Sequence, residues 1–312
     1  MKDLVEQKTL MGSMEFAGTA LHTGADTSVR VIPGAPDSGY RFRRLDVPGA
    51  PEVEASVHNI SDTLLATSLG LNGTSVKTVE HILSAMAGSG VDNAVIEVDG
   101  DEIPIMDGSA APFVQGIEIV GLAGQGVPKR MLRIKEEIVA GNGDASAALS
   151  PSDFFRISFR IAFDHPAVGV QELDFLYSPE AYRRDIAFAR TFGFYRDVER
   201  LQEKGLALGG SFDNAVVVGD EGVMNEGGLR APDEFVRHKI LDTIGDLSLL
   251  GIPILGHYQG HKAGHAVNRL LMQEVLQHPE RWELVCLEEI AQEKVVLHPI
   301  GKMVEIGVSA TL

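Results

Sequence analysis

The segment from Pro232 to Leu250 constrains the fold more than any other, because its pattern fits a helix that must lie against a core. Pro232 suits the first turn, and Gly251 marks the end. At about 100° per residue, one side of this helix is apolar and the opposite side carries a polar stripe. The apolar side comprises Val236, Ile240, Ile244 and Leu247, and the polar stripe comprises His238, Asp242 and Asp246. We therefore expect the helix to bury one face and to present the polar stripe on the other.

Two residues of the polar stripe, His238 and Asp242, are spaced for joint metal binding. Residues four apart share a helix face, where an imidazole and a carboxylate can close on one ion. Such a pair alone is more often found on a solvated helix surface. The segment Thr78-Val79-Glu80-His81, on a helix expected over 77–87, adds an imidazole and a neighbouring carboxylate. A hydrolytic zinc site needs three protein ligands, an open water position and a base. That set is supplied by His81, His238, Asp242 and Glu80.

A third histidine, His265, is a candidate for proton transfer. It lies in a glycine-rich turn that opens a helix expected over 264–277. As an imidazolium it could protonate a leaving amine, with Asp246 holding the charge. His261 competes for the same role, and a capping or core histidine is the alternative interpretation.

Three more polar side chains are candidates for substrate contacts. Thr191 lies in the otherwise apolar segment 191–194 and could donate a hydrogen bond to a developing oxyanion, although a core strand also explains this segment. Lys239 and Lys262 flank the candidate metal residues. They could neutralise a substrate phosphate or simply be solvated lysines.

Charge and composition exclude several classes of protein. The formal net charge of −17 argues against a nucleic-acid surface and against docking to anionic lipid. The single Cys286 cannot form an internal disulfide and excludes a zinc site made of thiolates. Residues 1–10 lack a signal peptide's apolar core, and no apolar run reaches the ~18 residues of a membrane span. We expect a soluble cytoplasmic protein without stable membrane insertion.

Strands and helices are mixed without regular alternation, which favours an α+β fold over a doubly wound parallel sheet. Strand-like patterns cover 4–46, 131–139 and 154–163, and a second early helix is expected over 109–120. Thr78 is the expected N-cap of the helix over 77–87. The glycine-rich segment 121–129 is the expected boundary between two domains.

An ordered set of short segments along nearly the whole chain resembles the UDP-3-O-acyl-N-acetylglucosamine deacetylase family. No single segment is specific for this family, but the whole set in this order is highly specific for it. In the first half these segments are Leu21-His22-Thr23-Gly24, Thr78-Val79-Glu80-His81, Val91-Asp92-Asn93 and the run from Glu102 to Ser109. In the second half they are the run from Ala189 to Phe194, the run from Leu208 to Asp213, Arg237-His238-Lys239, Asp242, Gly245-Asp246 and the run from Gly264 to Asn268.

The resemblance implies two similar α+β domains, each a β-sheet with helices, with the helices sandwiched between the two sheets. The first domain, 1–125, would supply Glu80 and His81. The second, 126–312, would supply His238, Asp242 and His265, together with an acyl-chain insert at about 190–213. The active site would lie where the domains meet.

The implied reaction is zinc-dependent hydrolysis of UDP-3-O-(3-hydroxyacyl)-N-acetylglucosamine to the free amine and acetate, the committed step of lipid A biosynthesis. The resemblance implies Zn²⁺ bound by His81, His238 and Asp242, with Fe²⁺ as an alternative ion. It implies Glu80 as the base, His265 with Asp246 as the acid, Thr191 as an oxyanion donor and Lys239 beside the metal. The implied substrate-binding residues are Leu21, Phe192, Phe194, Val198, Ala207, Gly210, Phe212 and Lys262. The acylated UDP-sugar would be the partner of a monomeric protein.

Two other functions remain compatible with these residues. Two histidines and one carboxylate also hold Fe(II) in non-haem oxygenases. A non-catalytic protein that binds a nucleotide sugar or lipid around a structural metal is the other alternative, although structural zinc sites mostly use cysteine and histidine.

Overall fold

The computed structural model describes residues 6–286, and the end of the expected second domain, 287–312, lies outside the described residues. The first half of the chain contains a mixture of strands and helices. Its elements are β1 (Glu6–Leu10), β2 (Met14–Thr19), β3 (Asp26–Pro33), β4 (Tyr40–Arg44), β5 (Glu52–Glu54), the 3-10 turn η1 (Val57–Asn59), β6 (Ile60–Asp62), β7 (Ser68–Leu71), β8 (Thr74–Val76), α2 (Glu80–Gly88), β9 (Ala94–Asp99), α3 (Ala111–Val120) and β10 (Leu122–Pro128).

The second half repeats this mixture. Its elements are β11 (Arg130–Ile134), β12 (Ile138–Asn142), β13 (Ala145–Ser150), β14 (Arg156–Ala162), β15 (Val170–Leu176), α4 (Pro179–Asp185), β16 (Phe192–Phe194), α5 (Tyr195–Glu203), β17 (Val216–Gly219), β18 (Gly222–Val223), α6 (Glu234–Leu247), η2 (Ser248–Leu250), β19 (Ile254–Leu255), β20 (His257–His261), α7 (His265–Gln277), η3 (Pro279–Arg281) and β21 (Trp282–Cys286).

The two halves have the same sheet topology. A five-stranded sheet in the order β2-β3-β9-β4-β5 belongs to the first half, and one in the order β12-β13-β20-β14-β15 belongs to the second. In each sheet the third and fourth strands are parallel (β9 with β4, and β20 with β14), and the other neighbours are antiparallel. The expected α+β fold with two similar halves is therefore confirmed.

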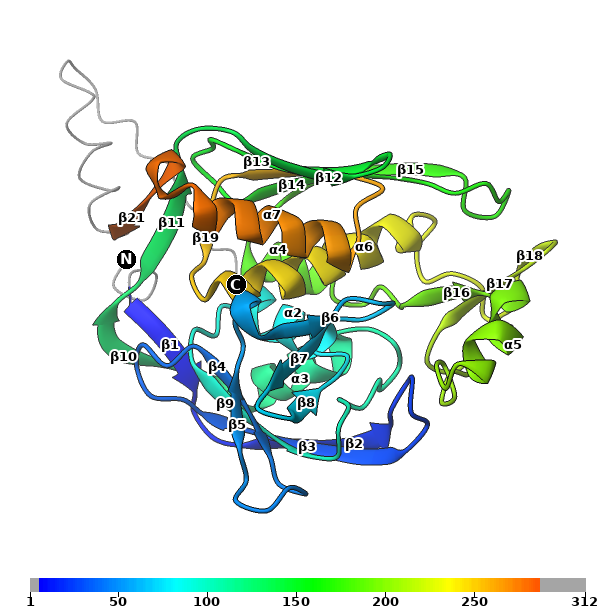
Figure 1. Cartoon of the computed structure of the whole chain (residues 1–312), viewed down its shortest axis with the longest axis horizontal. Helices are drawn as coiled ribbons and strands as arrows, with labels where there is room; N and C mark the ends of the chain where they lie inside the picture. Colours follow the sequence, from blue (N-terminus) through cyan, green and yellow to red (C-terminus); the bar gives the residue numbers. More distant parts are fainter. Residues whose placement is uncertain (1–5, 287–312) are drawn as a thin grey trace, which may run out of the picture.

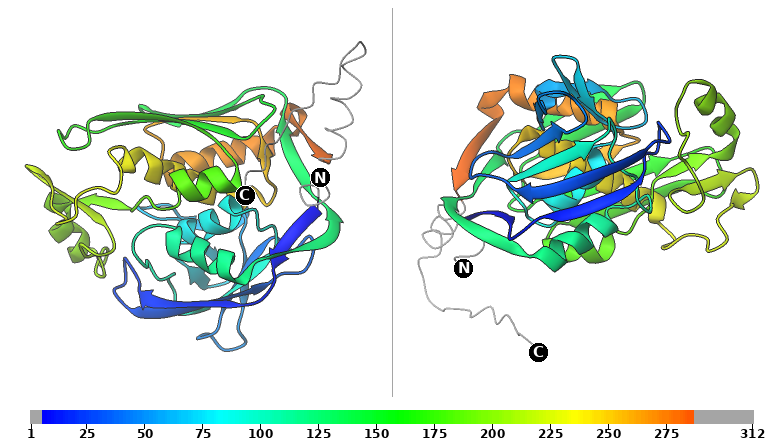
Figure 2. Two further views of the ribbon diagram at one scale, coloured as in Figure 1. Left: turned by 180° about the vertical axis from the view of Figure 1, so that it is seen from behind. Right: turned by 90° about the horizontal axis from the view of Figure 1, so that it is seen from below.

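The helices lie between these two sheets. Figure 1 shows β12–β15 above and β2–β5 with β9 below, and the layer between them holds α2, α3, α4, α6 and α7. Each half also carries a small three-stranded insertion, β6-β7-β8 in the first and β16-β17-β18 in the second. The second insertion, with α5, projects to one side of the molecule in every view (Figure 2).

The helices α2 and α6, one from each half, come into close backbone contact. A Cβ added at Gly245 would lie 2.1 Å from the Glu80 carbonyl oxygen, so only a glycine lets these backbones meet. One turn further along α2, the Ser84 hydroxyl donates to the Leu241 carbonyl at 2.7 Å. This packing sets the start of α2 against the C-terminal half of α6.

Three local expectations were wrong. Thr78 is not an N-cap, because α2 begins at Glu80 and the Thr78 hydroxyl donates instead to Glu102 at 2.8 Å. The strand expected over 131–139 is two strands, β11 and β12, in different sheets. The polar stripe of α6 is not presented outside the core, because α2 and α7 pack on α6 and leave it buried around most of its circumference. The segment 121–129 is mainly the strand β10, paired with β1.

We predict that Gly245→Ala displaces α2 from α6 and lowers the free energy of unfolding by about 1–3 kcal/mol, because the added methyl meets the Glu80 backbone. Thermal unfolding monitored by circular dichroism measures the effect. Gly227→Ala is the control, since a Cβ there has nothing within 4 Å and Gly227 is exposed. Equal melting temperatures for the two variants would contradict the importance of this contact.

Candidate metal centre

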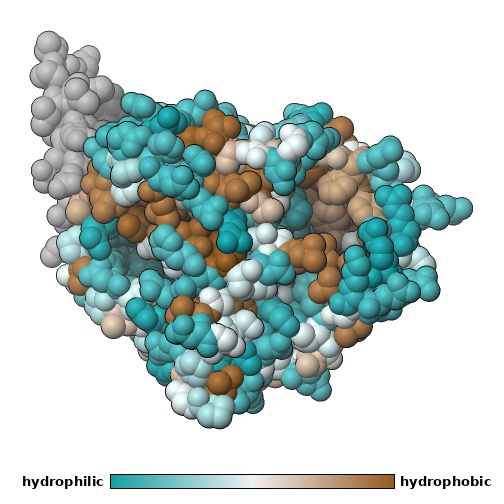
Figure 3. Space-filling model, in the orientation of Figure 1, coloured by the Kyte–Doolittle hydropathy of each residue, from teal (hydrophilic) through white to brown (hydrophobic). Residues whose placement is uncertain are grey.

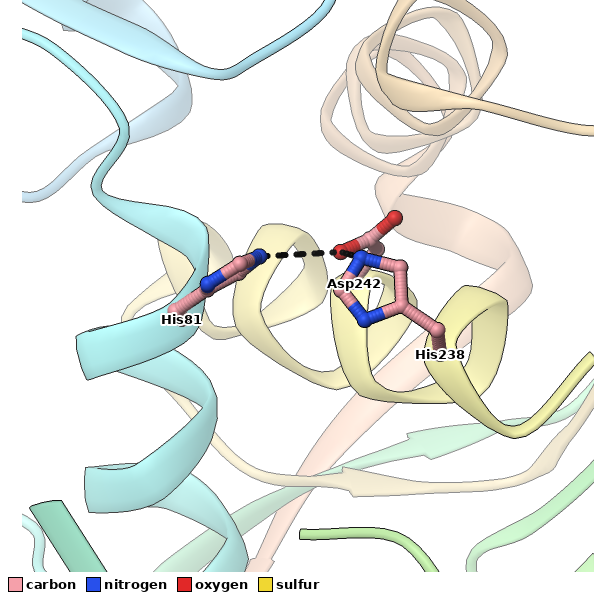
Figure 4. A group of neighbouring side chains, drawn as sticks. All are labelled: His81, His238 and Asp242. Atoms are coloured by element: carbon pink, nitrogen blue, oxygen red, sulfur yellow. Dashed lines mark ion pairs between the residues drawn. The ribbon is translucent and has the colours of Figure 1, made fainter. Parts of the chain in front are cut away.

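Three buried side chains from both halves converge at the α2–α6 contact. His81 is the second residue of α2, and His238 and Asp242 lie one turn apart on α6. One ligand atom from each lies within 4.8 Å of the others. The Asp242 Oδ1 atom is 3.2 Å from His238 Nε2 and 3.7 Å from His81 Nε2. Figure 4 shows the two rings and the carboxylate turned toward one shared point.

The protonation of these groups is the chemical reason that a cation fits this point. His238 Nδ1 lies 3.1 Å from the Ala189 carbonyl, so it carries the proton and leaves Nε2 as a lone pair facing Asp242. Burial lowers the pKa of His81 to about 3, with His238 adding to this, and burial also lowers the pKa of His238. Asp242 Oδ1 is buried without a hydrogen-bond partner. Two acceptors without a donor, His238 Nε2 and Asp242 Oδ1, therefore face the neutral His81 ring, and a metal ion bound by all three groups would satisfy them.

Glu80, next to His81 on α2, has the properties of a general base. Burial is the main cause that raises the pKa of Glu80 to about 7; His265 opposes this, and the carboxylates of Asp242 and Asp246 add to it. A base whose pKa lies near neutrality is efficient at physiological pH. Its Oε2 accepts the Thr67 backbone N–H at 3.0 Å, and its Oε1 lies 3.8 Å from His265 Nε2.

His265 begins α7 and forms an ion pair with Asp246. His265 Nδ1 lies 2.9 Å from Asp246 Oδ2. Burial alone would lower the pKa of His265, but the charge and hydrogen bond of Asp246, together with Glu80, raise this pKa to about 9. The ring is therefore an imidazolium at neutral pH and can donate a proton. The competing His261 lies on β20, 3.5 Å from an Arg160 nitrogen, and is not part of this cluster.

The segment that carries Thr191 is tied to the metal-site helix. Arg190 binds the buried Glu234 at the start of α6, with Nε 2.8 Å from Oε1, and the Ala189 carbonyl contacts His238. The Thr191 N–H donates to the Gly108 carbonyl at 2.8 Å. These bonds place a half-buried threonine beside β16 at the edge of the site.

The two candidate lysines have carboxylate partners. Lys239 Nζ donates to Asp242 Oδ2 at 2.7 Å and lies 5.7 Å from the centre of the Phe192 ring. Asp242 therefore presents its other oxygen to the two histidines. Lys262, just after β20, donates to Asp144 at 2.7 Å on the hairpin between β12 and β13.

The other candidate substrate residues lie on or beside the second insertion. Phe192 packs edge-on against Phe235 with ring centres 5.0 Å apart, and 6.2 Å from the His238 ring. Phe194 contacts Phe163, at 5.7 Å between ring centres. The backbone of Gly209 donates to the Leu21 carbonyl at 3.0 Å, which places Leu21 beside Gly210. Val198 and Ala207 are half-buried, Gly210 is exposed, and Phe212 is 51% exposed. Apolar surface is visible on this side of the molecule in Figure 3.

Two site residues were missed from the sequence. Thr67 donates its hydroxyl to Asp246 Oδ1 at 2.6 Å, and Asn268 donates to Asp246 Oδ2 at 2.8 Å. Asn268 follows His265 by three positions on α7, so helical spacing was a signal that could have found it. Thr67 gave no such signal, because 179 positions separate it from Asp246.

Comparisons with known proteins agree over most of the chain. A family model described as LpxC, UDP-3-O-acyl N-acetylglycosamine deacetylase, matches residues 7–277. The chain is 45% identical over 288 residues to a UDP-3-O-acyl-N-acetylglucosamine deacetylase of Teredinibacter turnerae, covering 92% of this chain and 95% of that protein. It is 46% identical to proteins of the same name from Acidithiobacillus ferrooxidans, covering 90% of this chain and 93% of that protein, and from Myxococcus xanthus, covering 89% of each.

Within residues 6–286, no helix has the length and apolar character needed to cross a membrane.

We predict that His265 titrates near pH 9 in the metal-depleted protein and that Asp246→Asn lowers this midpoint toward or below the ordinary ~6.5, because the carboxylate charge is removed. Since the folded pKa is raised, the pair's contribution to stability is complete below about pH 6.5 and is lost as pH rises through about 9. Side-chain NMR of labelled histidines measures both titrations. An unchanged midpoint in Asp246→Asn would contradict the assignment.

Proposed function

The chain belongs to the UDP-3-O-acyl-N-acetylglucosamine deacetylase family, and we propose that its buried cluster performs the corresponding reaction. The protein hydrolyses the acetamide of an acylated UDP-N-acetylglucosamine, releasing acetate and leaving a free amine, in the biosynthesis of lipid A. One observation carries this assignment for the site. A carboxylate with a pKa of about 7 and a protonated imidazole face each other across 3.8 Å beside three converging metal-type ligands.

The residues that would hold the metal are His81, His238 and Asp242. When bound, a divalent ion polarises the amide carbonyl and lowers the pKa of water. We propose Zn²⁺, because two imidazoles and one carboxylate with an open position are a typical catalytic zinc set. Fe²⁺ uses the same donors and is the alternative ion.

Glu80 would take the proton from the attacking water. Its Oε1 is the carboxylate oxygen that faces the site, because Oε2 is occupied by the Thr67 N–H. Burial disfavours the charged carboxylate of Glu80, so the group binds a proton more readily. Its raised pKa reflects this preference.

His265 would give a proton to the departing nitrogen. Its Nδ1 is held by Asp246, so the Nε2 proton is the one that faces Glu80 and the reacting atoms. Protonation makes the nitrogen a neutral amine as the C–N bond breaks, and the carbon fragment leaves as acetate. Thr191 would donate its hydroxyl to the carbonyl oxygen as negative charge develops.

Substrate binding would use the second insertion. Val198, Ala207, Gly210 and Phe212 would contact the acyl chain together with Leu21, and each buried methylene would contribute roughly 0.8 kcal/mol. Phe192, Phe194 and Lys262 would contact the nucleotide sugar, and Lys239 would lie beside the metal. The exposure of several apolar side chains on this insertion, Tyr195, Leu208, Phe212 and Met224, supports an apolar ligand at this place.

Three broader proposals accompany this function. The division between the halves would fall at 125/126, within β10, so that 1–125 supplies Glu80 and His81 and the remainder supplies the other site residues. The protein would act as a monomer, since both halves of one chain complete the cluster. A cytoplasmic location suits its single cysteine.

We predict that Glu80→Gln lowers acetate release by about 10²- to 10⁴-fold without loss of bound metal, because the amide cannot accept the water proton. Acetate is measured from a UDP-3-O-(3-hydroxyacyl)-N-acetylglucosamine, and metal content by elemental analysis. Glu172→Gln, at an exposed position of β15, is the matched control.

Three outcomes would oppose parts of this account. Near wild-type turnover by Glu80→Gln would remove Glu80 as the base. No acetate release from folded, metal-loaded wild-type protein would favour a non-catalytic binding protein. Oxygen consumption coupled to turnover would favour the Fe(II) oxygenase alternative.

A further inference from the structure

We propose that Thr67 is a positioning residue that sets the base Glu80 and the acid pair His265–Asp246 in register with each other. This inference rests on the proposed function and assigns a role to a residue that does not touch the reacting atoms. Thr67 lies immediately before β7, in the insertion of the first half, and is 1% exposed. Its carbonyl accepts the Val79 N–H at 3.1 Å, which ties it to the residue preceding α2.

The backbone of Thr67 orients the base. The Thr67 N–H donates to Glu80 Oε2 at 3.0 Å. A hydrogen bond to one carboxylate oxygen fixes the rotation of the group and leaves the other oxygen, Oε1, facing His265. It also supplies a buried carboxylate with one of the donors that it needs.

The side chain of Thr67 orients the acid pair. Its hydroxyl donates to Asp246 Oδ1 at 2.6 Å, a short distance typical of a hydroxyl bound to an ionised carboxylate. Asp246 Oδ2 receives Asn268 at 2.8 Å and His265 at 2.9 Å. Asn268 is held in turn by the Tyr258 hydroxyl at 2.7 Å. Both oxygens of Asp246 are therefore occupied, so the carboxylate cannot rotate without breaking a buried hydrogen bond.

The two hydrogen bonds of Thr67 reach groups on two different helices, α2 and α6. Glu80 is on α2, Asp246 on α6 and His265 on α7, so each group could shift with its own helix. One residue bonded to both carboxylates couples these shifts. Displacement of a catalytic group by ~1 Å can cost about 10²-fold in rate, so such coupling has a kinetic consequence.

The test is Thr67→Val, which keeps the shape but removes the hydroxyl. We expect kcat to fall by about 10- to 100-fold, the effect of losing one hydrogen bond to a charged group. KM and metal content should be unchanged, because Thr67 is buried away from substrate and is not a ligand. Thr67→Ser keeps the hydroxyl and should restore kcat to near the wild-type value.

A double-mutant cycle separates positioning from general loss of structure. If the hydroxyl acts through Asp246, Thr67→Val should cause little further loss of kcat in an Asp246→Asn background. Thr9→Val is the control, because that buried threonine donates to the Asn93 carbonyl at 2.7 Å, away from the site. Thr67→Ala, which also lacks the hydroxyl, replaces Thr67→Val if the valine variant does not fold.

The outcomes distinguish this inference from the proposed function. Full kcat in Thr67→Val, or a loss of equal size in the Asp246→Asn background, would overturn the role of Thr67. Absence of acetate release from the wild-type protein would instead contradict the proposed function itself.

Discussion

The contact between α2 and α6 is the constraint on which the functional site depends. Gly245 lets the Glu80 backbone approach α6 to a distance that no side chain would allow. The two helices come from different halves of the chain, and the Ser84–Leu241 hydrogen bond across this contact joins residues 157 positions apart. Because Glu80 and His81 open α2, this one contact sets the proposed base and a proposed metal ligand beside His238, Asp242 and Asp246.

The electrostatics of the site follow from burying many ionisable groups together. Burial keeps His81 and His238 neutral, while it raises the pKa of Glu80 toward neutrality. Asp242 and Asp246 carry charges that are compensated by Lys239 and His265, respectively. Buried charges are costly unless they are paired, so these pairs explain how the helix layer tolerates them. The acceptor atoms of this cluster that have no hydrogen-bond donor are the atoms that a metal ion would bind.

Local patterns predicted α2, α3, α6 and α7 but not α4, and the ordered motifs predicted the layered fold. The period of α6 was readable because Val236, Ile240 and Ile244 repeat at helical spacing. The burial of its polar stripe was not readable, because it depends on α2 and α7, which arrive from elsewhere in the sequence. For the same reason Thr78 was mistaken for a cap, since its hydroxyl partner, Glu102, is distant in sequence. Thr67 shows the limit most clearly, because its importance lies entirely in bonds to two distant carboxylates.

The measurement that tests the central claim most directly is acetate release during a Zn²⁺ titration of chelated protein. The account predicts no activity in the chelated protein and a linear return of activity that ends at one equivalent of zinc. It also predicts that His238→Ala, which removes one of the three converging ligands, returns little activity at that point. Full activity in the chelated protein, or in metal-depleted His238→Ala, would contradict a metal centre formed by the two halves.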